Sequence, residues 1–224
     1  MRSSRLVIFD WDGTLMDSVG RIVSSMRVTA TALNLVVPTY QSVKDIIGLS
    51  LEPAIERLFG RLPRAQYDRF LSRYRDEYVE FNTTPTPMFD NAEAVIQLLK
   101  QQQHAVAVAT GKARRGLDRV WAEVNIGPLF NASRCADETQ GKPNPQMLHE
   151  LMEELGYLPN QTIMVGDSVH DIRMATNAGV KAIGVDFGVH DRGRLLDAGA
   201  DHVVSNLDQL PLLITALTEE QVYE

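Results

Sequence analysis

Two aspartates, Asp10 and Asp12, stand two residues apart and directly follow the apolar run in "RLVIFDWD". A third, Asp167, ends another apolar run, "TIMVGD", far along the chain. Carboxylates that pack together repel, and each raises the pKa of the others unless a positive charge lies among them. A hard divalent cation supplies such a charge, and Mg²⁺ typically takes one or two carboxylates together with water and phosphate oxygens. These aspartates therefore predict a Mg²⁺ site if folding brings them together.

Two further clusters predict what such a site would bind. Thr110 and Gly111 belong to "VATGK", and Lys142 belongs to "GKPNP". A lysine offers a fixed positive charge, a threonine offers a hydroxyl, and backbone N–H groups can bind an anionic oxygen. Each cluster alone is a weak signal, because turns often carry Gly and Asp. Together with the aspartates, the clusters describe a site for a phosphoryl group.

Parallel strands can bring these distant clusters together. Short apolar runs typical of strands buried on both faces alternate with helical patterns. The predicted strands are 5–10, 104–110, 130–136, 162–167, 180–186 and 200–205, and the predicted helices are 91–103, 113–125, 144–156 and 170–179. This alternation predicts an α/β fold with a doubly wound parallel sheet. Ligands bind beyond the carboxyl ends of such strands, which is where the polar clusters fall.

One region interrupts the alternation. Residues 17–85 show helical patterns and no convincing strand, and "NTTPTPMFD" (82–90) has the composition of a return linker. The chain therefore predicts a core domain formed by residues 1–16 and 86–224, with an inserted helical domain at residues 17–85.

Composition limits the classes of partner. The chain has 224 residues and a net charge of −7, so it lacks the basic surface that nucleic-acid binding usually needs. No window approaches the ~18 apolar residues of a membrane span. The N-terminus resembles no signal peptide, and the single cysteine, Cys135, excludes an intramolecular disulfide. We expect a cytoplasmic protein with Cys135 as a small buried residue. The sequence does not determine the oligomeric state.

Several polar residues near these clusters have simpler structural explanations. Lys112 is expected to be a solvated residue at the start of a helix. Asp17 and Ser18 are interpreted as helix N-caps, and His170 as a surface or capping residue.

The motifs "FDWDGTLMDS", "VATGK", "GKPNP" and "VGDSVHDI", in this order on alternating strands, resemble the haloacid dehalogenase superfamily. The resemblance extends from residue 5 to about residue 205. The helical insertion after the first motif is similar to the C1-type cap of the phosphoglycolate phosphatase-like branch. The resemblance therefore implies a Rossmann-like core with an inserted helical cap domain.

The resemblance also implies roles for the residues of the motifs. Asp10 would be the nucleophile that forms an aspartyl-phosphate. Asp12 would be the general acid and base, which protonates the leaving alcohol and then activates water. Thr110 would hydrogen-bond the phosphoryl group, with Gly111 beside it. Lys142 would hold the nucleophile and the phosphoryl oxygens.

The same resemblance implies how Mg²⁺ would be bound. Its ligands would be the Asp10 side chain, the backbone carbonyl of Asp12 and the Asp167 side chain. Asp171 lies one helical turn after Asp167 in "GDSVHD" and would be a further metal partner, either direct or indirect.

The implied activity is Mg²⁺-dependent hydrolysis of a small phosphorylated metabolite. The segment "GLS" (48–50) resembles a cap loop that reaches into phosphatase sites, which makes three residues candidates for specificity: Gly48, Leu49 and Ser50. A turn between two helices is an equally good interpretation of this segment. Arg21, Arg27 and Arg57 could meet a second anionic group of the substrate, although we expect them on solvated helix faces.

Other activities remain as alternatives. Dehalogenases of this fold lack the second aspartate, so the presence of Asp12 favours phosphoryl transfer. Sugar-phosphate mutases similar to β-phosphoglucomutase usually carry Val where this chain has Thr14, and a basic residue near the positions of Leu51 and Glu52. A non-catalytic phospho-ligand binding or regulatory protein is a remote alternative, because it would be expected to have lost a catalytic residue.

Overall fold

A computed structural model, described here for residues 4–220, contains one sheet of six parallel strands. The strand order is β3-β2-β1-β4-β5-β6. The strands are β1 (Leu6–Phe9), β2 (Ala105–Thr110), β3 (Ala132–Cys135), β4 (Thr162–Gly166), β5 (Lys181–Val185) and β6 (His202–Val204). Each lies within a run that the sequence predicted as a strand, so the predicted doubly wound α/β fold is confirmed.

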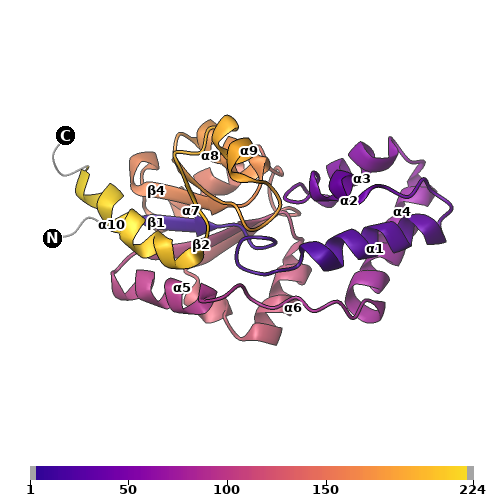
Figure 1. Ribbon diagram of the computed structural model, residues 1–224, viewed down its shortest axis with the longest axis horizontal. Coiled ribbons are helices and arrows are strands. Elements are labelled where there is room, and N and C mark those ends of the chain that lie inside the picture. The colour runs from indigo at the N-terminus through magenta and orange to yellow at the C-terminus, as the bar shows by residue number, and fades with distance from the viewer. Residues whose placement is uncertain (1–3, 221–224) are drawn as a thin grey trace.

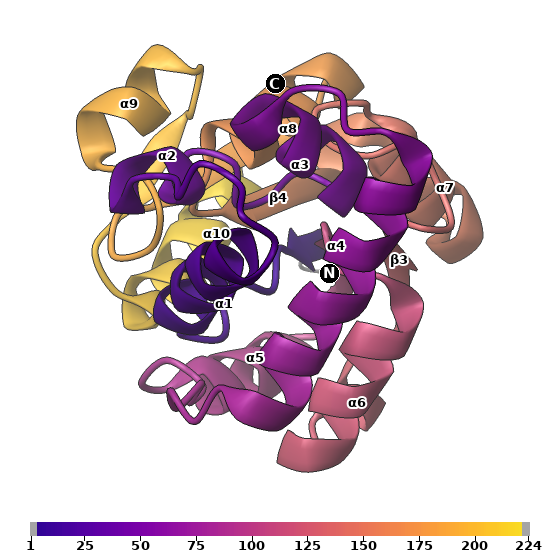
Figure 2. The same ribbon diagram turned by 90° about the vertical axis from the view of Figure 1, so that its right-hand side faces the viewer.

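Helices cover both faces of the sheet. One face is covered by α5 (Ala92–Gln101), α6 (Arg114–Val124) and α10 (Leu210–Glu220), and the other by α7 (Gln146–Leu155), α8 (Val169–Ala178) and α9 (Arg192–Asp197). Along β1, Val7 and Phe9 join the apolar cluster of the first face, whereas Leu6 and Ile8 join that of the second. This two-sided burial explains why the strands are apolar at every position. Figure 2 shows α7, α8 and α9 on the opposite side of the sheet from α5 and α6.

The four helices predicted in the core are confirmed as α5, α6, α7 and α8, whereas α9 and α10 were not predicted. Helix α10 has no single apolar stripe in "LPLLITALTEE", so the helical period is hard to see. Short 3₁₀ turns at Gly127–Leu129, Pro159–Gln161 and Leu207–Gln209 complete the core.

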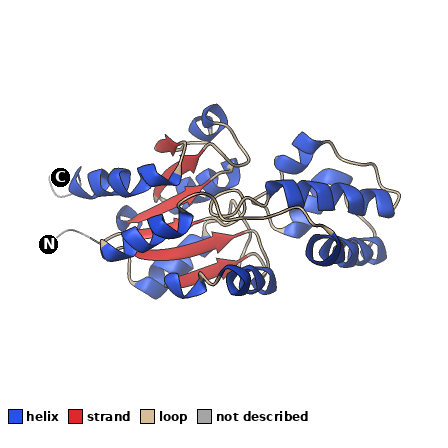
Figure 3. Cartoon of the chain, turned by 60° about the horizontal axis from the view of Figure 1, so that its bottom comes forward, coloured by secondary structure: helices blue, strands red, loops and turns tan. Residues whose placement is uncertain are grey.

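A group of helices, which we call the helical insertion, leaves the core after β1. It contains α1 (Val19–Ala32), α2 (Tyr40–Lys44), α3 (Leu51–Phe59), α4 (Arg64–Asp76) and the π-helical turn η1 (Glu77–Phe81). These helices pack around an apolar cluster of their own. Figures 1 and 3 show that the strands point toward this insertion, which lies beyond their carboxyl ends. The exact domain boundaries stay a prediction.

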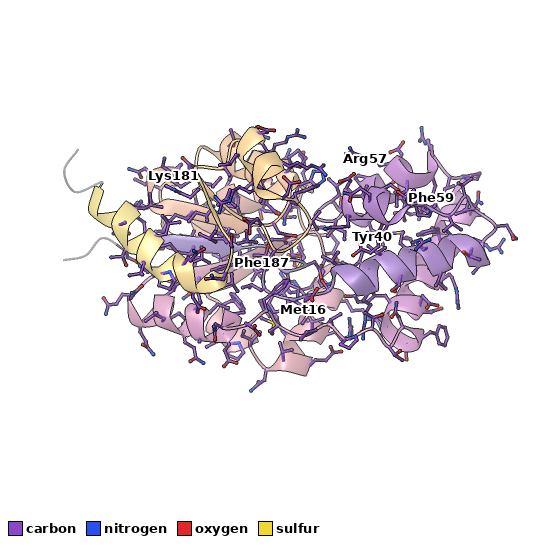
Figure 4. The ribbon with its side chains drawn as sticks, in the orientation of Figure 1. Met16, Tyr40, Arg57, Phe59, Lys181 and Phe187 are labelled. Atoms are coloured by element: carbon purple, nitrogen blue, oxygen red, sulfur yellow. The ribbon has the colours of Figure 1, made fainter. Side chains whose placement is uncertain are left out.

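The two chain crossings between core and insertion run side by side. The Asp17 N–H donates to the Pro87 carbonyl at 2.8 Å, and the Phe89 N–H donates to the Leu15 carbonyl at 2.9 Å. Met16, between them, lies at the junction in Figure 4. Because the crossings are bonded to each other, the insertion is attached to the core through one narrow connection.

Within residues 4–220, no helix is both long enough and apolar enough to cross a bilayer.

Candidate active site

The site lies where the strand order reverses. The chain continues from β1 to β2 on one side and returns to β4 on the other, so β1 lies between β2 and β4. Asp10 follows β1 and donates its N–H to the Val165 carbonyl at 2.9 Å. Asp167 follows β4, and the buried Thr110 ends β2. Parallel pairing therefore brings residues from three distant motifs to one edge of the sheet, as the sequence predicted.

Three buried carboxylates meet at this edge. Asp10, Asp167 and Asp171 each offer an oxygen, and these oxygens lie within 4.8 Å of one another. All three residues are at most 1% exposed. Carboxylates at such distances repel strongly in a buried site, so the cluster needs a positive partner.

Lys142 provides part of that positive charge. Its Nζ atom lies 2.7 Å from Asp10 Oδ1 and 2.6 Å from Asp171 Oδ1. Burial lowers the pKa of Lys142, but the charges of Asp10 and Asp171 outweigh burial and raise it above its ordinary value. The lysine is therefore a permanent cation beside Asp10.

Asp171 is fixed by the start of α8. Ser168 is the N-cap of this helix, and its N–H and hydroxyl donate to Asp171 Oδ2 at 3.0 Å and 2.6 Å. The other oxygen of Asp171 accepts from Lys142. This arrangement is a capping box, in which the side chains of Ser168 and Asp171 each accept from the other's backbone N–H. It also shows that both oxygens of Asp171 already have protein partners, so Asp171 is well placed to hold Lys142.

Asp167 is held by donors on both of its oxygens. The Thr14 hydroxyl donates to Oδ1 at 2.9 Å and the Val189 N–H donates to Oδ2 at 2.8 Å. Burial and the charge of Asp171 nevertheless raise the pKa of Asp167 to about 7. Gly13 makes the close packing possible, because a Cβ there would lie 2.1 Å from Asp167 Oδ2 and its φ is +84°. Only glycine fits this turn without strain.

Asp10 differs from its neighbours because, within the described part of the chain, its carboxylate is paired only with Lys142, 2.7 Å from Oδ1, and its Oδ2 has no hydrogen-bond partner. Burial and the charge of Asp171 raise the pKa of Asp10 well above its ordinary value. When all three carboxylates are ionised, the single ammonium leaves two of their negative charges unbalanced. A divalent cation fits this charge, and it prefers the oxygen ligands that are present. The residues therefore fit a bound Mg²⁺.

The Asp12 carboxylate lies apart from the metal-type cluster. Its Oδ1 atom is 2.8 Å from Lys112 Nζ and accepts from the Ser18 hydroxyl at 2.5 Å. The prediction of a solvated Lys112 was therefore wrong, because its side chain is only 11% exposed. Ser18 does occupy the N-cap position of α1, but its side chain makes no capping hydrogen bond. Instead, the Ser18 hydroxyl and the Lys112 ammonium both contact the Asp12 carboxylate.

The helical insertion packs against the core around this site. A Cβ on Gly111 would lie 2.8 Å from the Leu49 carbonyl oxygen, and one on Gly141 would lie 2.7 Å from the Ser50 hydroxyl. The predicted loop of Gly48, Leu49 and Ser50 therefore lies directly on the core. It lines a cavity of about 1200 Å³ together with Asp10 and Asp12. Its role in specificity stays a prediction.

A second contact of the insertion involves His170. The ring Nε2 atom of His170 lies 3.1 Å from the Asp45 carbonyl oxygen in the insertion, and the histidine is buried. The expectation of a surface position was therefore wrong. Arg194 of the core also donates to Asp45 Oδ1, at 2.7 Å. These bonds hold the segment after α2 on the core.

Three residues near the reacting groups were not predicted as part of the site: Lys112, Ser18 and Tyr78. Lys112 follows Thr110 by two residues, so its position in "TGK" was a usable signal. The sequence around Ser18 indicated only a helix N-cap and gave no sign of a role in the site. Tyr78 belongs to a helical pattern in a distant part of the sequence, and only the docking of the insertion brings it to the cavity.

Comparison with known proteins places this geometry among phosphatases. A family model described as haloacid dehalogenase-like hydrolase matches residues 7–185. A phosphoglycolate phosphatase of Agrobacterium fabrum is 34% identical over 197 residues, covering 84% of this chain and 83% of the relative. A pyrophosphatase, PpaX, of Bacillus mycoides is 27% identical, with 92% and 95% covered. The crystal structure of a predicted phosphoglycolate phosphatase from Haemophilus somnus superimposes with a TM-score of 0.85 at 22% identity, with 95% of this chain and 99% of that chain covered.

Proposed function

Because the chain belongs to the haloacid dehalogenase-like hydrolase family and its relatives are phosphatases, we propose that it is a Mg²⁺-dependent phosphatase of small phosphorylated metabolites. One observation carries the proposal. Asp10 is a buried carboxylate that pairs with Lys142 through Oδ1 and, among residues 4–220, leaves Oδ2 without a hydrogen-bond partner, within a cluster of three carboxylates. Such a group is available to a metal ion and to a phosphorus atom.

Asp10, Asp167 and the backbone carbonyl of Asp12 would hold Mg²⁺ in this proposal. Bound Mg²⁺ supplies charge stabilisation on the phosphoryl oxygens and orients the phosphoryl group. Asp171 acts mainly through Lys142, since both of its oxygens are already bonded to the protein.

The first chemical step joins Asp10 to phosphorus. A carboxylate oxygen of Asp10 attacks the phosphorus atom while the bond from phosphorus to the leaving oxygen breaks. Lys142 and the Thr110 hydroxyl bind the phosphoryl oxygens, whose charge they stabilise. Asp12 gives its proton to the leaving oxygen, so the products are an alcohol and an aspartyl-phosphate.

The second step uses Asp12 in the opposite direction. Asp12 accepts a proton from a water molecule, and the oxygen of that water attacks the aspartyl-phosphate. The bond between phosphorus and Asp10 breaks, which releases inorganic phosphate and restores the Asp10 carboxylate. Ser18 and Lys112 hold the Asp12 side chain close to the phosphoryl position in both steps.

The phosphatase proposal is favoured over a sugar-phosphate mutase by the surface of the insertion. Leu51 and Glu52 line the cavity, and neither is the basic residue that the mutases similar to β-phosphoglucomutase tend to carry there. We infer that water is the final phosphoryl acceptor.

Hydrolysis of p-nitrophenyl phosphate with and without Mg²⁺ tests the proposal. We expect Mg²⁺-dependent activity that Asp10→Asn abolishes. Asp17→Asn is the matched control, because Asp17 belongs to the same motif but is exposed and lies outside the carboxylate cluster. Hydrolysis that survives in Asp10→Asn would contradict the mechanism. A screen of phosphorylated metabolites would then identify the substrate.

A further inference from the structure

An apolar surface of the helical insertion borders the cavity at the active site. The cavity has a volume of about 1200 Å³ and contains both Asp10 and Asp12. Among the side chains that line it on the side of the insertion, we call the following five the apolar wall: Leu49, Leu51, Leu71, Tyr74 and Val79. Helices α3 and α4, which carry three of them, lie in the insertion beyond the carboxyl ends of the strands (Figure 1).

The apolar wall is only partly covered by the protein. Val79 is 37% exposed, and the other four side chains are half-buried and pack with one side against the apolar cluster of the insertion. Apolar surface in contact with water is unfavourable in proportion to its area, so a carbon skeleton that covers the wall would gain free energy. Small-molecule sites commonly have this form, in which apolar side chains bind the body of the ligand and a few polar groups orient it.

The charged residues of the cavity do not favour a second anionic group on the substrate. Besides Asp10, Asp12 and Lys112, the charged residues that line the cavity within residues 4–220 are the acids Glu52, Asp68, Asp76, Glu80 and Asp137 and the bases Arg75, Arg115 and Arg119. Arg75 and Arg119 are already paired with Asp76 and Glu123. A positively charged group would gain little either, because four of the five acids are exposed and water screens their charge. The apolar wall is therefore the feature that would select a leaving group.

The proposed reaction directs the leaving group toward this wall. Asp12 protonates the leaving oxygen, so the leaving group begins beside Asp12. Lys112 Nζ lies 2.8 Å from Asp12 Oδ1 and is also hydrogen-bonded to the Tyr78 hydroxyl of the insertion. The centre of the Tyr78 ring lies 6.0 Å from that of Tyr74, which belongs to the wall. Tyr78 therefore connects the position of the leaving oxygen with the apolar wall.

The cavity has room for a leaving group larger than a two-carbon alcohol. Cavities that bury drug-sized ligands usually have volumes of about 300–1000 Å³, and this cavity has about 1200 Å³. A two-carbon alcohol beside Asp12 would fill a small part of this volume and would leave the apolar wall in contact with water.

We propose that the apolar wall is a subsite for the leaving group, and this inference rests on the proposed function. The preferred substrates would be phosphate monoesters of uncharged alcohols with an extended aliphatic or aromatic body. The phosphoryl group would bind at Asp10 and Lys142 in the core, while the carbon skeleton of the alcohol would cover the wall of the insertion. Burial of apolar surface on both the ligand and the wall would then favour the docked position of the insertion.

Hydrolysis of a series of alkyl phosphates by the full-length protein with Mg²⁺ tests the proposal. Ethyl, butyl and hexyl phosphate have leaving alcohols of similar acidity, so differences in kcat/KM report binding of the carbon chain rather than intrinsic reactivity. We expect kcat/KM to rise by about threefold to fourfold for each methylene that the wall buries.

Charged leaving groups provide the comparison. Phosphoglycolate and phosphoethanolamine add a negative or a positive charge to a two-carbon alcohol, and both should have a lower kcat/KM than hexyl phosphate. A kcat/KM that does not rise with chain length, or that is higher for either charged compound than for hexyl phosphate, would overturn the subsite.

Two variants, Val79→Asn and Leu71→Asn, place a polar amide in the apolar wall. For each we expect kcat/KM to fall about tenfold more for hexyl phosphate than for ethyl phosphate, because the amide loses its water when the chain covers it. Val79 is exposed, so its replacement should leave the fold intact, whereas Leu71 also packs inside the insertion. Urea unfolding of both variants separates a loss of binding from a loss of stability.

Val28→Asn is the matched control, because Val28 is another exposed valine of the insertion, at 42%, and does not line the cavity. It should keep the dependence of kcat/KM on chain length. An equal loss of that dependence in Val28→Asn, or an unchanged dependence in both wall variants, would contradict the subsite. The proposed function would survive these results if Asp10→Asn still abolished hydrolysis of every compound.

Discussion

Lys142 and Lys112 each place an ammonium group beside an aspartate of the first motif, but the two pairs are built differently. Lys142 is fully buried, and its partners both belong to the core, because Asp10 follows β1 and Asp171 lies in the first turn of α8. Lys112 and Asp12 are 11% and 12% exposed and face Tyr78 of the helical insertion. The core alone therefore builds the half of the site that would bind the phosphoryl group. The half that faces the leaving group is complete only when the insertion docks.

Replacing each lysine by methionine tests this difference between the two pairs most directly. Lys142→Met leaves buried carboxylates without their cation, so we expect the free energy of unfolding without Mg²⁺ to fall by about 3 kcal/mol or more. The loss of one charged donor at the phosphoryl group should lower kcat by about 100-fold to 1000-fold. Lys112→Met should lower both the free energy of unfolding and kcat by a smaller amount, because the Lys112–Asp12 pair is more exposed than the Lys142 pairs. Urea unfolding and steady-state kinetics provide the measurements. Equal effects of the two variants would contradict the distinction between the two halves.

Replacing Gly13 or Gly111 by alanine tests the same distinction, because the added Cβ disturbs the packing of only one half of the site. Gly13→Ala would place a Cβ 2.1 Å from Asp167 Oδ2, which must displace that carboxylate. We expect Mg²⁺ affinity to fall by about tenfold or more, as measured by titration calorimetry. Gly111→Ala would place a Cβ 2.8 Å from the Leu49 carbonyl oxygen, which pushes the insertion away from the core. It should lower kcat/KM and leave Mg²⁺ affinity unchanged. Weaker Mg²⁺ binding in Gly111→Ala would show that the halves are not independent.

Ser18 tests how the Asp12 side chain is positioned. Ser18→Ala removes the hydroxyl that donates to Asp12 Oδ1, so kcat should fall by about tenfold. Stability should change little, because Ser18 makes no side-chain capping bond. Thr31→Val is the matched control on α1, since among the described residues its hydroxyl bonds only the Arg27 carbonyl of the same helix. A loss of about 1 kcal/mol in stability with unchanged kcat would identify Ser18 as an N-cap alone.

The smallest effect is expected at Cys135, which belongs to neither half of the site. The residue is fully buried at the end of β3, and burial raises the pKa of its thiol to about 12. The thiol therefore stays protonated at neutral pH and is not available as a nucleophile. We expect iodoacetamide to modify Cys135 only after unfolding in urea, as seen by mass spectrometry, and Cys135→Ala to retain full activity. Rapid alkylation of the native protein would contradict this assignment.

Much of the core half could be predicted because its signals are local. Continuous apolar runs identify buried parallel strands, and ligands bind at the carboxyl ends of such strands. Asp10, Thr110 and Asp167 each stand at the end of a run or directly after it, and the structure brings them to one edge of the sheet. Cys135 was likewise expected to be buried, and it is.

The half that faces the insertion could not be predicted in the same way. The periodicity of "RDEYVEF" identifies a helix but does not say which core residue the helix will meet. Lys112 was expected in solvent because lysine is rarely buried without a partner, and its partner Asp12 lies a hundred residues earlier. His170 was expected to be a surface or capping residue, because its contact with the Asp45 carbonyl joins two segments that are far apart in the sequence.

The sequence by itself determined the six parallel strands, the four core helices from α5 to α8 and the group of carboxylates that would bind a metal. Periodicity and strand ends are properties of neighbouring residues, so they can be read along the chain. Only the tertiary structure decided that Lys112, Ser18 and Tyr78 gather around Asp12. That arrangement depends on how the insertion packs on the core. This packing is set by the complementary shapes of surfaces formed by residues far apart in the sequence, and no local sequence pattern describes it.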